Sequence, residues 1–225
     1  MFYTLMQQSH SSTLATSWTN YWNIISYRRL FIGGITLLIG TLVAMPHFFQ
    51  AIEKRSGTLL DDWVLAAIPT QDVSIPIFLF IWGTTLLLLI RAVQHPVICI
   101  TFLWSYLMVT LSRMVSISLI PLDAPTGLIP LVDPISNYFY GETFVTKDLF
   151  YSGHVSTQFL MFLCFTKKND KILALCAVLL VSILLLVQHV HYTLDIIAAP
   201  IFSYLFWLIA KKITNNTVHY NIQTR

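Results

Sequence analysis

Residues 171–195, KILALCAVLLVSILLLVQHVHYTLD, indicate the fold class of this chain. Between Lys171 and Asp195 it contains no lysine, arginine, aspartate or glutamate. A helix that crosses the hydrocarbon core of a bilayer needs about 20 mostly apolar residues, and this stretch is long enough. We therefore predict a membrane-spanning helix here.

The composition of the whole chain extends this prediction. Hydrophobic residues make up 56% of the 225 residues, and charged residues only 10%. A soluble domain usually carries about 25% charged residues. A chain of this length normally forms one domain, so a bilayer accounts for the apolar excess better than a large soluble core does. The net charge of +3 is small and the basic residues are not clustered, which argues against nucleic-acid binding.

Uncharged, mostly apolar stretches recur along the chain, and they predict an all-α membrane protein, a six-transmembrane-helix bundle. The predicted spans are residues 30–52, 73–90, 92–112, 149–166, 172–194 and 196–210. Only Asp195 separates the last two spans. Either the fifth span ends near His189 and a tight turn follows, or Tyr192 already belongs to the sixth helix. We favour the second arrangement because it gives the sixth span a sufficient length.

The predicted parts of the chain are an N-terminal cytoplasmic or interfacial segment (1–27), the bundle (28–212) and a cytoplasmic tail (213–225).

The distribution of basic residues predicts the orientation of the bundle. With a cytoplasmic N-terminus, nine of the 13 lysines and arginines fall on the cytoplasmic side. The other four, Lys54, Arg55, Arg113 and Lys147, fall on the opposite side. Cytoplasmic loops carry the excess of basic residues in membrane proteins, so we expect both termini in the cytoplasm.

Two segments outside the predicted spans differ in character. In the first, apolar residues recur at helical spacing from Leu14 to Ile25, ahead of Arg28 and Arg29. This fits either a helix in the membrane interface or a disordered tail. In the second, residues 121–148 contain four prolines, which predict irregular backbone, and a loop of this length is more often functional than idle.

Four ionisable residues at the non-cytoplasmic ends of the predicted spans are candidates for chemistry: Arg113, His154, His191 and Asp195. Such residues are costly within spans and tend to be functional. His191 and Asp195 are four apart, so on a helix they share one face. The carboxylate can then hold one imidazole nitrogen while the other acts as base or nucleophile. A polar helix end wetted by the interface would show the same spacing.

The second histidine, His154, follows Ser152 and Gly153 at the start of a predicted span. Ser152 is a candidate N-cap, with Asp148 as its competitor. The helix N-terminus would offer N–H groups to an anion, and Gly153 would let that anion approach the backbone. His154 could protonate a leaving oxygen. Arg113 could grip phosphate with its planar fork, or form an ion pair with a carboxylate on the same side.

Two stretches resemble motifs of a known enzyme family. Lys147-Asp148-Leu149-Phe150-Tyr151-Ser152-Gly153-His154 resembles the G-D-x-x-x-S-G-H motif of sphingomyelin synthases. His189-Val190-His191-Tyr192-Thr193-Leu194-Asp195 resembles their H-x-H-Y-T-x-D motif. Both motifs belong to the wider type-2 phosphatidic acid phosphatase (PAP2) superfamily, whose shared elements are S-G-H and H-x3-D. Arg113 ahead of Leu119-Ile120-Pro121, and the stretch Leu60-Asp61-Asp62, resemble looser family motifs.

The resemblance implies a PAP2-like core and a role for each matched residue. His191 would attack phosphorus and form a phosphohistidine, Asp195 would orient it, and His154 would act as acid and then as base. The expected phosphate-binding positions are Arg113, Ser152 and Gly153, and the further substrate-contacting positions are Asp148, Tyr192 and His189. The reaction would need no metal and no cofactor. The H-x-H spacing of His189 and His191 looks like a metal signature, but residues two apart on a helix point to different faces.

Three functions remain open at this point. The phosphatase branch usually carries K-x6-R-P before S-G-H and S-R-x5 before the second histidine, and neither is present. Thr146 and Val155 stand where the synthases frequently have cysteine and threonine. We favour transfer of a phospho-head-group to a ceramide- or diacylglycerol-like alcohol over hydrolysis of a lipid phosphate. A transporter or binding protein is the third possibility, but the polar residues cluster at one membrane face. In each case the partners are membrane lipids.

Overall fold

The structure, a computed structural model, describes residues 18–131 and 145–223, with side chains as far as Asn215. Within these ranges the regular secondary structure is helical, apart from an isolated β-bridge between Thr58 and Leu122. The helices are α2 (Trp18–Trp22), α3 (Ile25–Glu53), α4 (Trp63–Ala66), α5 (Ser74–Gln94), α6 (Pro96–Leu119), α8 (Gly153–Cys164), α9 (Lys168–Val187) and α10 (Thr193–Gln223). Leu14 and positions 132–144 of the predicted irregular loop lie outside the described residues.

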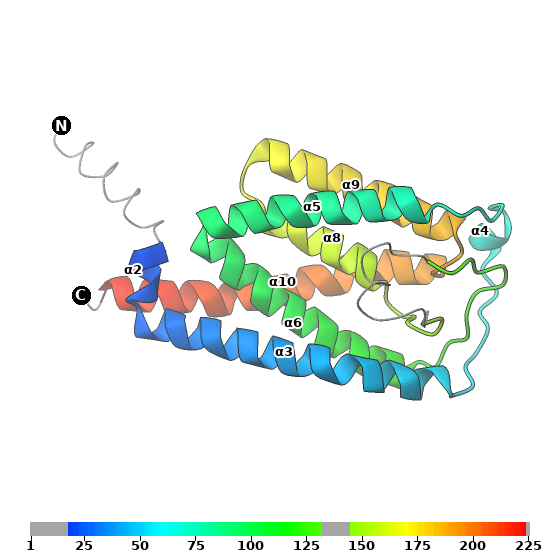
Figure 1. Cartoon of the computed structure of the whole chain (residues 1–225), viewed down its shortest axis with the longest axis horizontal. Coiled ribbons are helices and arrows are strands. Elements are labelled where there is room, and N and C mark those ends of the chain that lie inside the picture. Colours follow the sequence, from blue (N-terminus) through cyan, green and yellow to red (C-terminus); the bar gives the residue numbers. More distant parts are fainter. Residues whose placement is uncertain (1–17, 132–144, 224–225) are drawn as a thin grey trace.

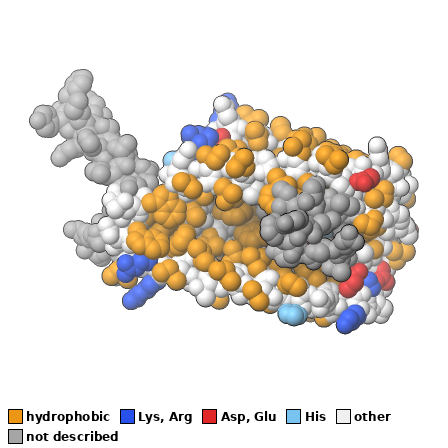
Figure 2. All heavy atoms as spheres, in the orientation of Figure 1, with side chains coloured by type: hydrophobic (Ala, Val, Ile, Leu, Met, Phe, Trp, Pro, Cys, Tyr) orange, Lys and Arg blue, Asp and Glu red, His pale blue; other side chains and the backbone are white. Residues whose placement is uncertain are grey.

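Among the described residues, five helices are long and apolar enough to cross a membrane, namely α3, α5, α6, α9 and α10. This fits an integral multi-pass membrane protein. The chain reverses direction at each step from α3 through α5, α6, α8 and α9 to α10 (Figure 1). The end of α10 lies at the same end of the bundle as α2 (Figure 1). Figure 2 shows a largely hydrophobic flank with charged side chains gathered toward the two ends, as expected for a bundle surrounded by lipid.

Helix α8, at the position of the predicted fourth span, is shorter than expected. It has 12 residues, which make about 18 Å of helix against a hydrocarbon core about 30 Å thick. It begins only at Gly153 because Ser152 caps it, and it ends at Cys164, where Phe165 takes an extended conformation. The prediction of a helix over residues 149–166 is therefore wrong at both ends, and the six-span count stays a prediction.

Helix α6 forms the centre of the bundle and packs against α10, α3, α8 and α5. Of the apolar stretch of α6, 50% is buried, whereas only 11% of the apolar stretch of α3 is buried. Helix α3 therefore presents most of its surface to lipid. The bend between α5 and α6 comes from His95, because a residue before proline is driven to extended backbone, and Pro96 then starts α6. Arg113, in the last third of α6, is thereby placed at the far end of the bundle from this bend.

The described part of the N-terminal segment packs against the bundle. Tyr21 contacts Tyr27, with ring centroids 5.1 Å apart, and the Tyr27 hydroxyl donates to the carbonyl of Pro96 at 3.1 Å. The Trp18 indole donates to the carbonyl of Val93 at 2.7 Å. Helix α3 already begins at Ile25. For residues 18–27 the structure therefore shows a short helix and the start of α3, and not a disordered tail.

The turn between α9 and α10 corrects the favoured arrangement of the last two spans. Helix α9 stops because His189 has φ 54°, in the left-handed region. The His189 N–H donates to Leu186 and the Val190 N–H to Leu185, which is the hydrogen-bond pattern of a Schellman motif. Tyr192 thus precedes α10, which begins at Thr193. The sixth helix gains its length at its other end, since it continues past the predicted domain boundary at position 212 to Gln223.

Candidate active site

The buried carboxylate of Asp195 joins the two sequence motifs. Its Oδ1 accepts the Phe150 N–H at 3.2 Å, and its Oδ2 accepts the Tyr192 N–H at 3.2 Å. The Nδ1 atom of His191 lies 3.4 Å from the same Oδ2. The main-chain oxygen of Asp195 also accepts the Ser152 N–H at 3.2 Å. Asp195 is fully buried, so this one residue fixes the loop before α8 against the start of α10.

The two imidazoles of the candidate site face each other across this junction. The ring centroids of His154 and His191 lie 6.3 Å apart, and their planes are inclined by 63°. His191 lies in the turn before α10, and not on a helix as the spacing argument assumed, yet it still reaches Asp195. Because its Nδ1 faces Asp195, its Nε2 is the nitrogen available for chemistry.

Helix α8 begins at the site with a serine cap. The Ser152 hydroxyl oxygen accepts the Val155 N–H at 3.4 Å, so Ser152 is the N-cap and Asp148 is not. His154 lies in the first turn of this helix, and its ring also contacts Phe78, with centroids 6.4 Å apart. The positive end of the α8 dipole therefore lies beside His154.

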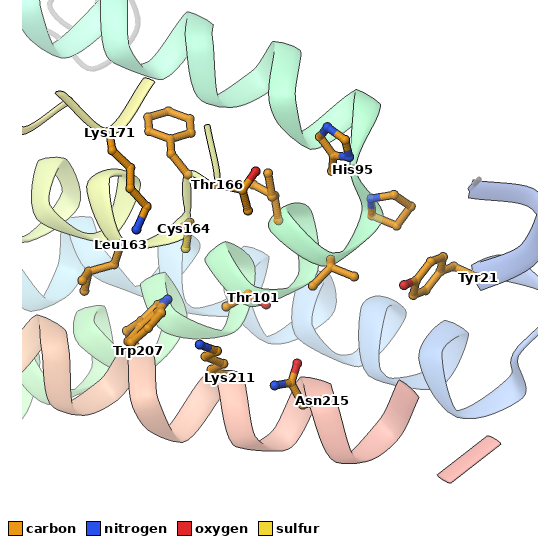
Figure 3. Close-up of a pocket in the computed structure, with 14 residues that line it drawn as sticks. Tyr21, His95, Thr101, Leu163, Cys164, Thr166, Lys171, Trp207, Lys211 and Asn215 are labelled. Carbon is orange, nitrogen blue, oxygen red and sulfur yellow. The ribbon is translucent and has the colours of Figure 1, made fainter. Parts of the chain in front are cut away.

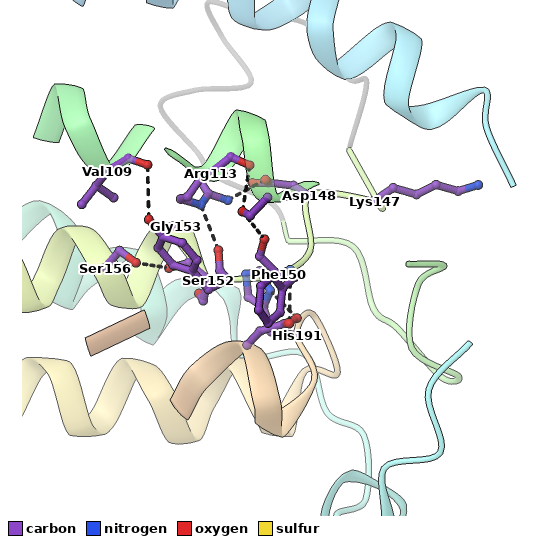
Figure 4. A network of polar contacts seen from close by, with 12 residues as sticks. Val109, Arg113, Lys147, Asp148, Phe150, Ser152, Gly153, Ser156 and His191 are labelled. Carbon is purple, nitrogen blue, oxygen red and sulfur yellow. Dashed lines mark hydrogen bonds and ion pairs between the residues drawn. The ribbon is translucent and has the colours of Figure 1, made fainter. Parts of the chain in front are cut away.

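Arg113 reaches the same helix end from α6. Its Nε donates to the carbonyl of Tyr151 at 2.9 Å, and its Nη2 donates to Oδ1 of Asp148 at 2.5 Å (Figure 4). Its Nη1 makes no hydrogen bond within the part of the chain that the structure describes, and it lies against Gly153. The ion pair that we considered for Arg113 therefore exists, and it still leaves one edge of the fork for an anion.

Asp148 stays ionised beside Arg113. Burial works against its ionisation, but the charge and hydrogen bond of Arg113 outweigh this effect and hold the pKa of Asp148 below its usual value. The guanidinium is thus fixed by a charged partner at any pH above the usual carboxyl range.

Two serines of α6 support the loop that carries these groups. Ser116 donates to the carbonyl of Phe150 at 2.8 Å, and the hydroxyls of Ser112 and Tyr151 are 2.6 Å apart. Together with Arg113, they hold positions 148–152 by side chains from a single helix. Neither serine was predicted to have a role, although their spacing around Arg113 on one helix is visible in the sequence.

Replacing Gly153 by alanine tests how closely the helix end approaches Arg113. A Cβ at this position would collide with the Arg113 guanidinium, which Asp148 and the Tyr151 carbonyl hold in place. We expect Gly153→Ala to displace Arg113 and to lower turnover by about 10- to 100-fold, because small misplacements at a reacting centre are costly. The control is Gly83→Ala in α5, where a Cβ meets nothing within 4 Å. Equal activity of both variants would contradict this packing.

A cavity of about 220 Å³ opens at this group of residues. Arg113, Asp148, Gly153 and His154 line its polar end, and the rest of its lining includes Met45, Ile81, Tyr106, Val109, Thr110, Thr157 and Gln158. His191, only 2% exposed, is not among the lining residues. We expected one pocket lined by both histidines. The two rings do lie close together, but only His154 lines the cavity.

Gln158, on the wall of this cavity, was not predicted. It follows His154 by four residues, so it lies one helical turn deeper on the same face of α8. Its Oε1 is 2.7 Å from the Thr84 hydroxyl. Its Nε2 is buried and has no hydrogen-bond partner among the described residues. A buried amide at this depth can hydrogen-bond an oxygen of a bound lipid. The i, i+4 spacing from His154 was the only sequence signal.

Two predicted substrate contacts, His189 and Tyr192, lie elsewhere. They line a separate cavity of about 340 Å³ that Arg113 does not reach. The ring nitrogens of His189 lie 2.9 Å from the carbonyl oxygens of Thr126 and Ile68. The Tyr192 hydroxyl donates to the carbonyl of Asp123 at 2.9 Å. In this geometry both side chains tie the turn before α10 to neighbouring loops.

No group of three or more histidine, cysteine or acidic side chains within residues 18–131 and 145–215 is arranged to hold a metal ion. The H-x-H pair does not converge, because the His189 ring is directed to backbone carbonyls and the His191 ring to Asp195.

Asp62 anchors the start of α10, a function that its weak motif did not reveal. Its Oδ2 accepts the Thr193 N–H at 2.6 Å, and its Oδ1 accepts the Thr193 hydroxyl at 3.0 Å. Oδ1 also caps α4 by accepting the Leu65 N–H at 3.1 Å. One carboxylate thus fixes both α4 and the residue that follows the His191–Tyr192 turn.

Asp62→Ala should lower the free energy of unfolding by about 1–2 kcal/mol, as loss of a capping carboxylate typically does. Burial opposes ionisation of Asp62, but the N–H groups of Thr193 and Leu65 outweigh it and lower its pKa. The stabilisation by Asp62 is therefore complete at pH values above the usual carboxyl pKa of 3.8. It is lost as the pH falls through the lower pKa that Asp62 has in the folded protein. Thermal unfolding of both proteins from pH 8 to pH 3 should show a constant difference that narrows only below about pH 4. The matched control is Asp61→Ala at the exposed neighbour. An equal loss there would contradict the anchoring role.

The fold and the site define a multi-pass helical membrane protein with a buried histidine–aspartate pair, a second histidine and a fixed arginine. Residues 147–212 match the family model described as PAP2 superfamily C-terminal. This segment contains both motifs, α8, α9 and the first two thirds of α10. The match supports membership of the PAP2 superfamily, whose members are generally phosphatases or phosphotransferases. No curated protein and no solved structure matches the chain.

Proposed function

We propose that this chain is a lipid phosphotransferase that moves a phospho-head-group from a phospholipid to a lipid alcohol through a phosphohistidine at His191. The observation that carries the proposal is the pair of imidazoles 6.3 Å apart beside the fixed guanidinium of Arg113. This separation leaves room for a phosphoryl group between a nucleophile and an acid. The active site is proposed to face the non-cytoplasmic side.

In the first step, Nε2 of His191 attacks phosphorus, and the bond from phosphorus to the oxygen of the departing lipid breaks. A protonated His154 gives its proton to that oxygen, so the lipid leaves as a neutral alcohol. Asp195 stabilises the positive charge that develops on the His191 ring. Nη1 of Arg113 and the N-terminus of α8 stabilise the phosphoryl oxygens.

In the second step, the now neutral His154 removes the proton from the acceptor hydroxyl. The acceptor oxygen forms a bond to phosphorus, and the bond from phosphorus to His191 breaks. His154 is then protonated again, and His191 returns to its starting state. No group other than the donor and acceptor lipids is consumed.

The burial of the site favours a lipid alcohol over water as the acceptor. His191 is 2% exposed and Asp195 is fully buried, so the intermediate would form out of contact with bulk water. The cavity lining beyond His154 is mostly apolar, which suits a lipid chain.

The decisive experiment is to incubate purified protein with a phospholipid labelled in its head group, with and without a ceramide or diacylglycerol acceptor. Labelled product lipid that appears only with the acceptor would support transfer. Release of water-soluble phosphate ester at the same rate in both samples would identify a phosphatase instead. The absence of any turnover, with intact labelled donor bound, would favour a lipid-binding protein.

A further inference from the structure

A cavity of about 450 Å³ lies apart from His154 and His191. It lies between the start of α6, the turn from α8 to α9 and the second half of α10 (Figure 3). Lys211, on its wall, follows Asp195 by 16 residues of α10, which amounts to about 24 Å along the helix. The cavity is therefore separate from the candidate active site and lies toward the opposite end of the bundle.

Two lysines enter this cavity from different helices. In Figure 3, Lys171 extends toward Cys164, and Lys211 extends beside Trp207. The Lys211 ammonium lies 4.7 Å from the centroid of the Trp207 ring. The Lys171 ammonium lies 5.5 Å from the centroid of the Phe162 ring. Aromatic faces at these distances favour a cation, so they hold both ammonium groups near the apolar wall.

Neither lysine has a carboxylate partner among the described residues. The nearest acidic residue in sequence, Asp170, is taken by Arg91 in a two-point contact, at 2.6 Å and 3.1 Å. The cavity thus carries two positive charges that no acid of the described residues neutralises, above a wall of apolar and aromatic side chains. An anion attached to an apolar body complements both features.

The position of the lysines along their helices indicates where that anion would come from. Lys171 directly precedes the apolar run of α9, and Lys211 directly follows that of α10. Both ammonium groups therefore lie at the boundary between hydrocarbon and head groups, where basic pockets between spanning helices meet anionic lipids.

We propose that this cavity binds the phosphodiester head group of an anionic glycerophospholipid from the adjacent leaflet. The phosphate lies between the ammonium groups of Lys171 and Lys211, and Asn215 on the same lining is available to hydrogen-bond the glycerol and head-group oxygens. The acyl chains leave along the apolar surface beside Trp207. A lipid in this place would connect α6, the α8–α9 turn and α10, and would stabilise the bundle without taking part in the reaction.

The test compares thermal unfolding of the delipidated full-length protein in a neutral detergent during titration with phosphatidylglycerol. Lys171→Gln/Lys211→Gln should weaken the apparent affinity by about 30-fold, since each lysine near the membrane surface contributes about fivefold. The matched control is Lys167→Gln/Lys212→Gln, which removes the same charge from exposed neighbours outside the lining. Phosphatidylcholine and the soluble head group glycerophosphoglycerol should both be much weaker than phosphatidylglycerol.

Several outcomes would overturn the proposal. They are equal losses in the two double variants, equal effects of the anionic and zwitterionic lipids, and full stabilisation by glycerophosphoglycerol alone. The stabilisation must also survive in Arg113→Gln, because its loss there would place the lipid in the catalytic cavity. If Lys171→Gln/Lys211→Gln does not fold, a salt titration of the unaltered protein provides the test. The stabilisation by phosphatidylglycerol must weaken as the salt concentration is raised. A stabilisation that is independent of salt would exclude binding at the two lysines.

Discussion

Replacing His191 by alanine is expected to abolish both turnover and the formation of any phosphorylated enzyme. The imidazole is the nucleophile in the proposed reaction, and no other described nucleophile shares its contact with Asp195 and its 6.3 Å separation from His154. Removing a nucleophile of this kind costs many orders of magnitude in rate. The measurement is the amount of labelled phosphoenzyme trapped by a rapid acid-free quench, since phosphohistidine is labile in acid.

The His191→Ala variant is compared with a variant of the second histidine, His154. His154→Ala should slow reaction with natural lipids but largely spare a donor with a low-pKa leaving group, which needs little protonation. His47→Ala, in the exposed part of α3, controls for the loss of an imidazole elsewhere. If His191→Ala retained undiminished label, another residue would carry the phosphoryl group, and the roles of both histidines would have to be redrawn.

The spanning helices were predictable because their signal is local. An apolar stretch without charges identifies itself from composition alone, and α3, α5, α6, α9 and α10 all overlap predicted spans. The ends were less predictable, because tertiary contacts set them. The left-handed conformation of His189 that stops α9 occurs without a glycine, and its side chain contacts the distant carbonyls of Ile68 and Thr126. No local pattern predicts such a stop.

The same distinction between local sequence signals and tertiary contacts applies to the candidate site. Arg113, His154, His191 and Asp195 were visible because ionisable groups at span ends stand out against an apolar background. The residues that hold them in place did not stand out. Asp62 was noted only as part of a loose family motif, and its anchoring role was hidden because Thr193 is 131 positions away. Ser112 and Ser116 resemble ordinary helix residues until the loop that they support is placed beside them.

The separation of His189 and Tyr192 from the Arg113 cavity shows how a motif can combine two tasks. His191 and Asp195 supply the groups for chemistry, whereas His189 and Tyr192 contact the loops around residues 60–68 and 123–126. A short motif can therefore carry both a reacting pair and the anchors that fix its position. The H-x-H spacing here directs the two rings to different partners, the His189 ring to backbone carbonyls and the His191 ring to Asp195.

Asp195→Asn is expected to lower turnover by about 10³- to 10⁴-fold while the protein still folds. The substituted amide cannot stabilise the charged His191 ring, and it can hold the imidazole in the wrong tautomer. The amide can accept the Phe150 N–H with its oxygen, but its NH2 group then faces the Tyr192 N–H in place of Oδ2. Two opposed donors cost about 1–3 kcal/mol, so a lower unfolding temperature should accompany the loss of activity.

The two effects of Asp195→Asn can be separated by measuring turnover per folded protein at a temperature well below the unfolding transition. Asp72→Asn is the matched control, because Asp72 also accepts two hydrogen bonds, from the Ser74 N–H and hydroxyl, but is exposed and forms no ion pair with His154 or His191. It should leave turnover per folded protein unchanged. If Asp195→Asn lost stability but kept its turnover, Asp195 would be only the structural link between the two motifs. His191 would then need no carboxylate for its reaction, and the positive charge on its ring would have to be stabilised by another group.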